Sequence, residues 1–247
     1  MEQRKRPGGN SGSGYYTSWE KKKKNGCIYC GNPAETREHI PSKTLLVEPY
    51  PENLPTIPAC FICNNGFSAD ELYVSCFLDT LKCSIFSNYD LTTETVTRLE
   101  KTPTLSKRLQ EDIQTINGEV SFSYDKEKLL RILVKLAQGH VGFEFDHLSF
   151  DNDSLKVWYD FVFNLSESDI LEFNKIPEDD KAPEVGSRGM VTPFIVQNIE
   201  TGEASVFMFW HDVQDEQYRY QIYYNENNEL EVKIVILEML YFLAVFN

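Results

Sequence analysis

The chain has 247 residues, of which 41% are hydrophobic and 25% are charged, as in globular proteins that bury a sizeable core. It contains no apolar run of about 18 residues, and no apolar stretch follows its basic first residues, so we expect neither a transmembrane helix nor a secretory signal. These features favour a cytoplasmic protein without membrane contacts, and the formal net charge of −14 argues at first sight against a polyanionic partner.

The charge is unevenly distributed along the chain. Residues 1–45 contain nine Lys and Arg against four Asp and Glu, whereas the remainder contains 15 against 34. Attraction to the phosphates of nucleic acid would therefore come from the N-terminal fifth of the chain. The acidic remainder would repel nucleic acid and favours a different partner, such as a protein.

The first 24 residues are dominated by Gly, Ser and Lys and show no hydrophobic period. This composition predicts a disordered basic tail. The run Lys21–Lys24 is either a solvated linker or a non-specific phosphate contact beside the module that follows.

Residues 26–66 are rich in Cys, Pro, Gly and Asn and lack the periodicity needed for an apolar core of their own. Two Cys-x-x-Cys pairs, Cys27/Cys30 and Cys60/Cys63, bracket this segment. Four thiolates at about 2.3 Å from the metal make a closed tetrahedral zinc site, and such a site supplies folding free energy directly. We therefore predict structural zinc bound by these four cysteines, since disulfides are not expected in a reducing compartment.

Helical periodicity begins at Phe67 and continues to Phe86. Asp70 and Glu71 are interpreted as acidic residues at the start of this helix, where they complement its dipole. Cys76 and Cys83, spaced seven residues apart on one face, are interpreted as core thiols.

The next segments are less regular. We expect a loop with a short helix around Lys107–Ile116, and then a helix capped by Asp125 that runs through Gln138, with Gly139 as a plausible stop. The chain then becomes rich in β-branched and aromatic residues, which predicts an antiparallel sheet packed on the helices. The predicted strands are Val157–Leu165, Val191–Ile199, Ala204–Trp210 and Tyr218–Tyr224, whereas Glu229–Phe246 is apolar enough for either a strand or a helix.

Between and just after the two cysteine pairs lie Glu38-His39-Ile40-Pro41, Glu52-Asn53-Leu54 and Asn64-Asn65. In this order the motifs resemble the HNH endonuclease superfamily. Its zinc-stapled branch typically has a Cys-x-x-Cys pair, an acidic residue before His, an Asn-Leu step and a second Cys-x-x-Cys pair followed by His or Asn. The resemblance covers about residues 25–75, and the motifs are specific only as a set.

This resemblance implies a β-hairpin followed by a helix around one divalent metal, and cleavage of nucleic acid. It implies that His39 is the general base, that Glu38 is a metal ligand, and that Asn53 steadies the hairpin and orients the histidine. Asn64 would be the ligand at the start of the helix, where its oxygen suits Mg²⁺ or Mn²⁺. The sequence does not separate Asn64 from Asn65, and Asn53 is equally well interpreted as a turn residue.

Chemistry places one constraint on this assignment. Adjacent side chains of a strand point to opposite faces, so Glu38 and His39 would need a loop or bulge to converge on one metal. Glu38 and Asn64 also stand where the family more often has Asp and His, respectively.

Together these observations predict an α+β protein. Residues 1–24 form the disordered tail, residues 25–86 form an N-terminal ββα-metal (HNH) module with a four-cysteine zinc knuckle pair, and residues 87–247 form a mixed helix plus antiparallel-sheet domain. This second domain either recognises a partner or holds the module inactive.

The expected activity is metal-dependent endonuclease cleavage of nucleic acid, with DNA favoured over RNA. It would require structural Zn²⁺ and catalytic Mg²⁺ or Mn²⁺, and the family resemblance suggests a prokaryotic or phage defence or mobile-element setting. The alternative is a non-catalytic zinc-ribbon module that binds nucleic acid or a protein.

Overall fold

The computed structural model describes residues 23–145, 155–177, 194–197, 199, 201–202, 204–207 and 209–246. The predicted basic tail up to residue 22 lies outside this part of the chain, as does much of the strand predicted at 191–199. No helix among the described residues has both the length and the apolar character needed to cross a membrane.

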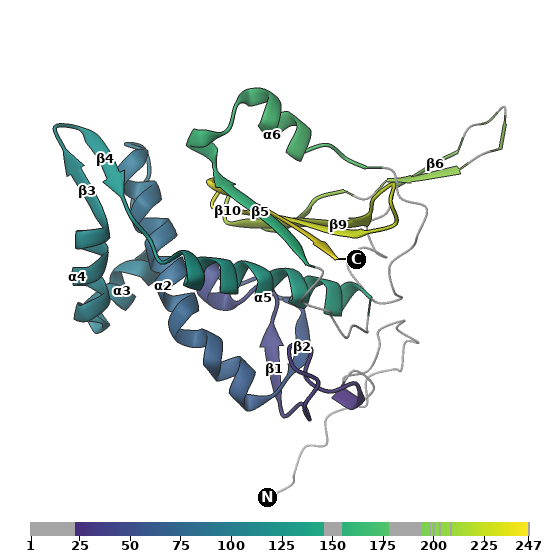
Figure 1. Ribbon diagram of the computed structural model, residues 1–247, viewed down its shortest axis with the longest axis horizontal. Helices are drawn as coiled ribbons and strands as arrows, with labels where there is room; N and C mark the ends of the chain where they lie inside the picture. The colour runs from purple at the N-terminus through teal and green to yellow at the C-terminus, as the bar shows by residue number, and fades with distance from the viewer. Residues whose placement is uncertain are drawn as a thin grey trace, which may run out of the picture.

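The N-terminal part is a β-hairpin followed at once by a long helix (Figure 1). Strand β1 (Thr36–His39) pairs antiparallel with β2 (Thr56–Ala59), and a 3-10 turn, η1 (Lys43–Leu45), lies in the connection. Helix α2 (Phe61–Ile85) begins directly after β2. The order of these elements is therefore strand, strand, helix.

Helix α2 begins earlier than its predicted start at Phe67. Cys60 caps it, because the thiol of this residue accepts the backbone N–H of Cys63 at 3.3 Å. The first turn escaped the periodicity analysis because its apolar residues, Phe61 and Ile62, are exposed. The interpretation of Asp70 and Glu71 as helix-start charges was wrong, since both are buried well inside the helix.

Four short elements separate α2 from the next long helix: α3 (Thr93–Lys101), α4 (Pro103–Asp112), β3 (Ile113–Ile116) and β4 (Glu119–Phe122). The helix predicted at Lys107–Ile116 corresponds to α4, which begins four residues earlier and ends four residues earlier than predicted. Ile113–Ile116 forms a hairpin with β4, because Asn117 and Gly118 turn the chain with φ angles of 54° and 86°.

Helix α5 spans Lys126–Glu144, and Asp125 caps it as predicted, accepting the N–H of Lys128 at 3.1 Å. The predicted stop at Gly139 was wrong. This glycine lies buried inside the helix, where a Cβ atom would come within 2.3 Å of the Ile40 side chain. Its function is close packing and not helix termination.

The predicted antiparallel sheet is confirmed. Its five strands lie in the order β5-β11-β10-β9-β8, and each neighbouring pair is antiparallel. The undecided stretch after residue 229 forms two of these strands, because Leu237 and Glu238 adopt positive φ angles and turn the chain between them. The strands are β5 (Lys156–Phe161), β8 (His211–Gln214), β9 (Tyr218–Tyr224), β10 (Leu230–Ile236) and β11 (Leu240–Phe246).

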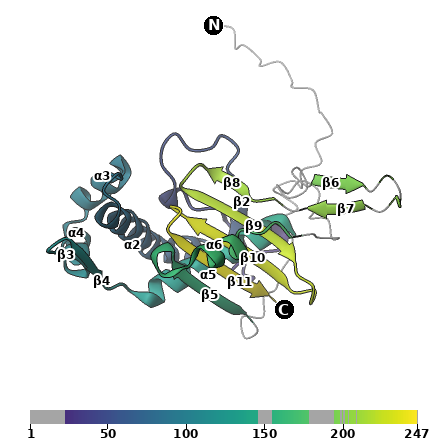
Figure 2. The ribbon, with the colours of Figure 1, turned by 90° about the horizontal axis from the view of Figure 1, so that it is seen from above.

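Three small elements complete the described structure. The 3-10 turn η3 (Val162–Asn164) and helix α6 (Glu167–Phe173) follow β5, and α6 packs on the outer face of the sheet through Phe173. Strands β6 (Phe194–Gln197) and β7 (Ala204–Phe207) form a separate hairpin at one end of the molecule (Figure 2).

Helix α5 lies between the five-stranded sheet and the β1–β2 hairpin (Figure 1). Its apolar face shares one hydrophobic core with α2 and the sheet, to which Phe77, Leu133 and Ile234 belong. This core crosses the domain boundary predicted at residue 86. Independent folding of residues 25–86 stays a prediction.

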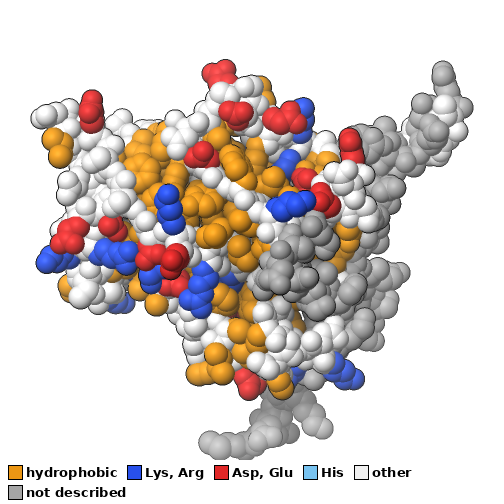
Figure 3. Space-filling view, viewed as in Figure 1, with side chains coloured by type: hydrophobic (Ala, Val, Ile, Leu, Met, Phe, Trp, Pro, Cys, Tyr) orange, Lys and Arg blue, Asp and Glu red, His pale blue; other side chains and the backbone are white. Residues whose placement is uncertain are grey.

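The face of the molecule seen in Figure 3 has hydrophobic side chains across its centre. Lys and Arg side chains lie next to Asp and Glu along the lower margin of this area, without a broad basic patch on this face.

Candidate functional site

The two Cys-x-x-Cys pairs come together in one cluster. The thiol sulfurs of Cys27, Cys30, Cys60 and Cys63, here called the four-cysteine cluster, all lie within 4.8 Å of one another, and Cys30 and Cys60 are 3.7 Å apart. Sulfurs bound tetrahedrally at about 2.3 Å from zinc are separated by about 3.8 Å. The four cysteines can therefore hold a metal ion and are consistent with structural zinc.

Local backbone structure positions each pair of cysteines. In the first pair, the N–H of Gly31 donates to the carbonyl of Cys27 at 2.8 Å, which closes a tight knuckle. The N–H of Asn32 lowers the pKa of the Cys30 thiol to about 7, whereas burial raises the pKa of the Cys27 and Cys63 thiols, whose thiolates a bound cation would have to stabilise. The second pair stands at the junction of β2 and α2, so a bound metal would join the knuckle, the hairpin and the helix.

Glu38 and His39 lie on the regular strand β1 and face apart. The Glu38 side chain is buried, with the whole residue 7% exposed, whereas His39 is half-buried on the opposite face. Burial and the charge of Lys43 lower the pKa of His39, so its imidazole is neutral at neutral pH. The strand contains neither the loop nor the bulge that convergence on one metal would need.

The buried face of β1 contains a second polar cluster. The Lys135 ammonium donates to Glu38 Oε1 at 2.7 Å, to Ser42 Oγ at 2.6 Å and to Glu71 Oε1. Ser42 Oγ in turn donates to Glu71 Oε1. We call these four residues the Lys135 centre. The three N–H groups of the ammonium thus have three oxygen acceptors, and the Lys135 side chain is only 1% exposed.

Glu38 and Asn64 do not fit the catalytic metal that the sequence predicted at these residues. Glu38 already pairs with a buried ammonium, whereas Mg²⁺ would need the same carboxylate at about 2.1 Å. The Asn64 side-chain amide donates to Thr36 Oγ1 at 3.0 Å, at the opposite end of β1. In this arrangement a divalent cation and Lys135 cannot both occupy the place beside Glu38.

The remaining predicted residues lie at the surface. Asn53 is exposed in the turn before β2, and Asn65 is exposed on α2, whereas Asn64 faces β1. The structure therefore distinguishes Asn64 from Asn65 by position, which the sequence did not.

Sequence reasoning missed three members of the Lys135 centre: Ser42, Glu71 and Lys135. Two signals were present. Glu71 follows Asn64 by seven residues, which places both on one helix face. Lys135 is an isolated lysine among the apolar residues of its predicted helix, and a lone cation there needs a buried partner.

One face of α5 is shaped to dock on the hairpin. Lys135, Gly139 and Gly142 follow one another at spacings of four and three and so share this face. A Cβ on Gly139 would lie 2.3 Å from Ile40 Cδ1, and one on Gly142 would lie 2.4 Å from Ile28 Cδ1. The glycines let these isoleucines reach the helix backbone, and this close contact holds Lys135 against Glu38.

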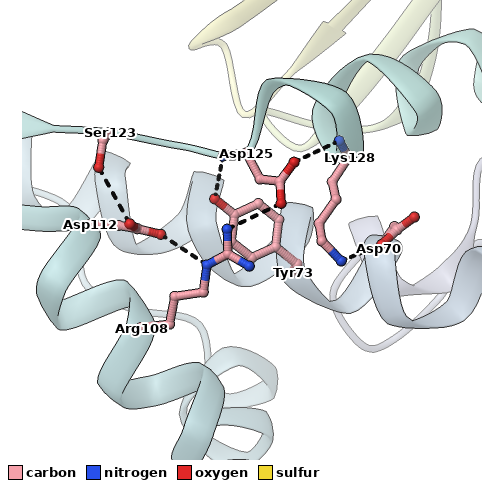
Figure 4. Close-up of polar contacts among 7 residues, drawn as sticks. All are labelled: Asp70, Tyr73, Arg108, Asp112, Ser123, Asp125 and Lys128. Atoms are coloured by element: carbon pink, nitrogen blue, oxygen red, sulfur yellow. Dashed lines mark hydrogen bonds and ion pairs between the residues drawn. The ribbon is translucent and has the colours of Figure 1, made fainter.

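The N-terminal end of α5 is anchored separately (Figure 4). Arg108 pairs with Asp125 at 3.1 Å and lies over the ring of Tyr73, whose hydroxyl accepts the N–H of Asp125. Lys128 pairs with Asp70 of α2 at 2.7 Å. These contacts fix α5 on α2 and α4 about two turns before Lys135.

A further buried polar set lies between α5 and the sheet. His140 Nε2 is 2.8 Å from the Tyr218 hydroxyl, and its ring stacks on Tyr220 with centroids 3.7 Å apart. The Tyr220 hydroxyl donates to Glu144 at 2.6 Å. These contacts join α5 to β9 inside the core.

Comparison of the chain with protein-family models, with curated proteins and with solved structures finds no match. The features of the chain that bear on function are therefore the two clusters around the hairpin and His39.

Proposed function

We propose that this protein is an HNH-type endonuclease that hydrolyses phosphodiester bonds of nucleic acid, with DNA favoured over RNA. The observation that carries the proposal is the hairpin–helix unit, in which β1, β2 and α2 follow one another and the four-cysteine cluster joins them. The motifs that resemble the HNH superfamily all fall within this unit. The defence or mobile-element setting belongs to the same proposal and derives from the resemblance alone.

In this proposal zinc bound by the four-cysteine cluster is structural, because four thiolates leave no open position for substrate. It would hold the hairpin against α2 and so position His39. Since the remaining contacts of the hairpin with α5 are apolar or buried, the exposed face of β1 is the part that nucleic acid can reach.

His39 is the proposed general base. Hydrolysis forms a bond from water oxygen to phosphorus and breaks the bond from phosphorus to the leaving oxygen, and His39 would accept the proton of the attacking water. Arg37 shares the outward face of β1, because it is two residues away, and Lys43 is exposed close to His39. These two cations are suited to attract the phosphates on either side of the scissile bond.

A second function is favoured by one specific observation, the pairing of Glu38 with Lys135. If the carboxylate never binds a metal, the unit would be a zinc-stapled module that binds nucleic acid or protein without cutting it. The two functions differ in whether cleavage occurs and depends on His39.

The test is incubation of purified protein with plasmid DNA and with RNA, with Mg²⁺, with Mn²⁺ and with chelator. The wild type should cut, and His39→Ala should lower the rate by about two to four orders of magnitude, as expected for loss of a general base. Zinc content and affinity for nucleic acid should stay near wild type.

Asn65→Ala is the matched control, because Asn65 is exposed on α2 and lies outside both clusters. It should cut at the wild-type rate. Equal rates for wild type and His39→Ala would show that the activity comes from a contaminant or another site. Absence of cleavage by the wild type with every metal would favour the binding module.

A further inference from the structure

A cavity lies between the segment that links β4 to α5 and the end of β5. Its volume is about 540 Å³, within the range of roughly 300–1,000 Å³ that small-molecule sites occupy. Figure 3 shows hydrophobic side chains gathered over this part of the molecule, between β4 and β5. Neither the four-cysteine cluster nor the Lys135 centre contributes a residue to the lining of this cavity.

Aromatic rings form two walls of the cavity. The rings of Phe122 and Tyr124 are close to parallel, with 24° between their planes, and the Phe161 ring stands at 78° to the first and 79° to the second. Phe122 and Tyr124 are half-buried and line the cavity, so part of each ring stays accessible from it. Such a right-angled corner accepts a flat ring, which stacks on one wall and meets the other with its edge.

Polar groups of the cavity have unused hydrogen-bonding capacity. The hydroxyl oxygens of Tyr124 and Tyr159 are 3.4 Å apart, where one donates to the other, so the O–H of the accepting tyrosine has no acceptor among the described residues. Asp160 Oδ1 accepts the backbone N–H of Phe161 at 2.7 Å and the amide of Asn164 at 2.8 Å, which fixes the carboxylate. No described residue donates to Asp160 Oδ2. The cavity therefore offers one donor and one acceptor beside the aromatic corner.

Lys126 supplies a cation at the same cavity. It is the exposed first residue of α5, and it forms no ion pair with any residue that the structure describes. The neighbouring acidic residues Asp112 and Asp125 are both paired with Arg108. The positive end of the α5 dipole adds to the charge of Lys126. An unpaired ammonium at the start of a helix favours a ligand with an anionic group, and phosphate suits this place best.

We infer that this cavity binds a nucleoside monophosphate, with its base in the corner between Phe122 and Phe161 and its phosphate on Lys126. Asp160 Oδ2 accepts a ribose hydroxyl or an amino group of the base, and the tyrosine pair donates to a base or ribose acceptor. A sugar phosphate would leave the aromatic corner empty, and a nucleoside would leave Lys126 without an anion. Only a ligand that combines a planar ring with a phosphate uses both.

This site is separate from the hairpin. Lys126 precedes Lys135 by nine residues, which is about 14 Å along α5. The inference therefore does not rest on the proposed endonuclease activity.

Isothermal titration calorimetry of the zinc-loaded full chain, without added Mg²⁺ or Mn²⁺, tests the inference. The probes are the four ribonucleoside 5′-monophosphates, each compared with its nucleoside, and ribose 5-phosphate. At least one nucleotide should bind once per chain with a Kd below about 1 mM, and about tenfold more tightly than its nucleoside or ribose 5-phosphate. Saturable binding by none of the four nucleotides, or equal affinity for the best nucleotide and ribose 5-phosphate, overturns the inference. Tighter binding of indole-3-acetate, an aromatic carboxylate, than of every nucleotide also overturns it.

Two substitutions assign the phosphate and the base to their places. Lys126→Met should weaken nucleotide binding at least about fivefold and leave nucleoside binding unchanged, because it removes only the cation. The matched control is Lys107→Met on α4, whose side chain is 78% exposed and lies outside the cavity, and which should bind both like wild type. Phe122→Leu, with folding verified by thermal unfolding, should weaken nucleotide and nucleoside alike, because a stacking wall is lost. Unchanged nucleotide affinity in Lys126→Met or in folded Phe122→Leu contradicts the inference.

Cleavage assays separate this inference from the proposed function. Nucleotide binding by a protein that cuts no nucleic acid supports the nucleotide site and contradicts the nuclease. Cleavage that depends on His39, without nucleotide binding, supports the nuclease and overturns the nucleotide site.

Discussion

The four-cysteine cluster and the Lys135 centre lie at opposite ends of strand β1 and bring together four residues each. The cysteines come in two local pairs, and the cation that would balance their thiolates is not part of the chain at this place. In the Lys135 centre the cation is part of the chain, 97 residues away from Glu38 in sequence. The first cluster can hold an ion from solution, whereas the second is closed by a lysine on a distant helix.

This difference shows which of the two clusters has room for a metal ion. Soft thiolates at tetrahedral spacing have no cation of their own and favour zinc. Hard carboxylates of the kind that bind Mg²⁺ or Mn²⁺ are already paired with an ammonium. One cluster can therefore take up a metal ion, whereas in the other the carboxylates of Glu38 and Glu71 are neutralised by Lys135.

The largest effect should come from breaking the four-cysteine cluster. Cys60→Ser should lose zinc and unfold the hairpin, because structural zinc contributes roughly 10–16 kcal/mol, as much as a whole domain's stability. Hydrogen exchange should show that the amides of β1 and β2 lose protection, while those of β9–β11 keep it in the separate core.

Cys83→Ser is the matched control, since Cys83 lies on the same helix outside the cluster. It should keep zinc and the protection of the hairpin. Full zinc content in Cys60→Ser would contradict the four-cysteine site.

The next largest effect concerns the stability of the Lys135 centre. Lys135→Met leaves two buried carboxylates without their cation and should cost about 3–5 kcal/mol in the free energy of unfolding. Lys128→Met breaks a partly exposed pair and should cost about 1 kcal/mol or less. Denaturant titration with zinc present measures both. Equal losses of unfolding free energy in the two variants would mean that the Lys135 centre stabilises the protein no more than a partly exposed ion pair does.

The smallest effect concerns the contact that holds α5 on the hairpin. Gly139→Ala should destabilise the protein by about 1–3 kcal/mol through overpacking against Ile40, in spite of the better helix propensity of alanine. Gly66→Ala on α2 meets only Arg131, at 3.7 Å, and should stabilise by up to about 1 kcal/mol.

Thermal unfolding of the two variants at equal zinc loading measures this difference. Stabilisation by both substitutions would contradict the tight docking of α5.

The sequence by itself determined the features that depend on neighbouring residues. The Cys-x-x-Cys spacing predicted four thiols that the structure brings together, and Asp125 was identified as a helix cap from its place before an apolar period. Segments rich in β-branched and aromatic residues predicted the antiparallel sheet. Each of these signals depends on spacings of a few residues, which the sequence states directly.

Only the tertiary structure decided which residues surround Glu38 and what structural role Gly139 has. The partners of Glu38 come from α2 and α5, and the sequence alone does not fix which helix faces which strand. Glycine is a residue type typical of helix ends, but the role of Gly139 is set by its contact with Ile40 of the hairpin, 99 positions earlier. Buried charges and close backbone contacts depend on how distant elements pack, because their energies arise only when those elements exclude water together.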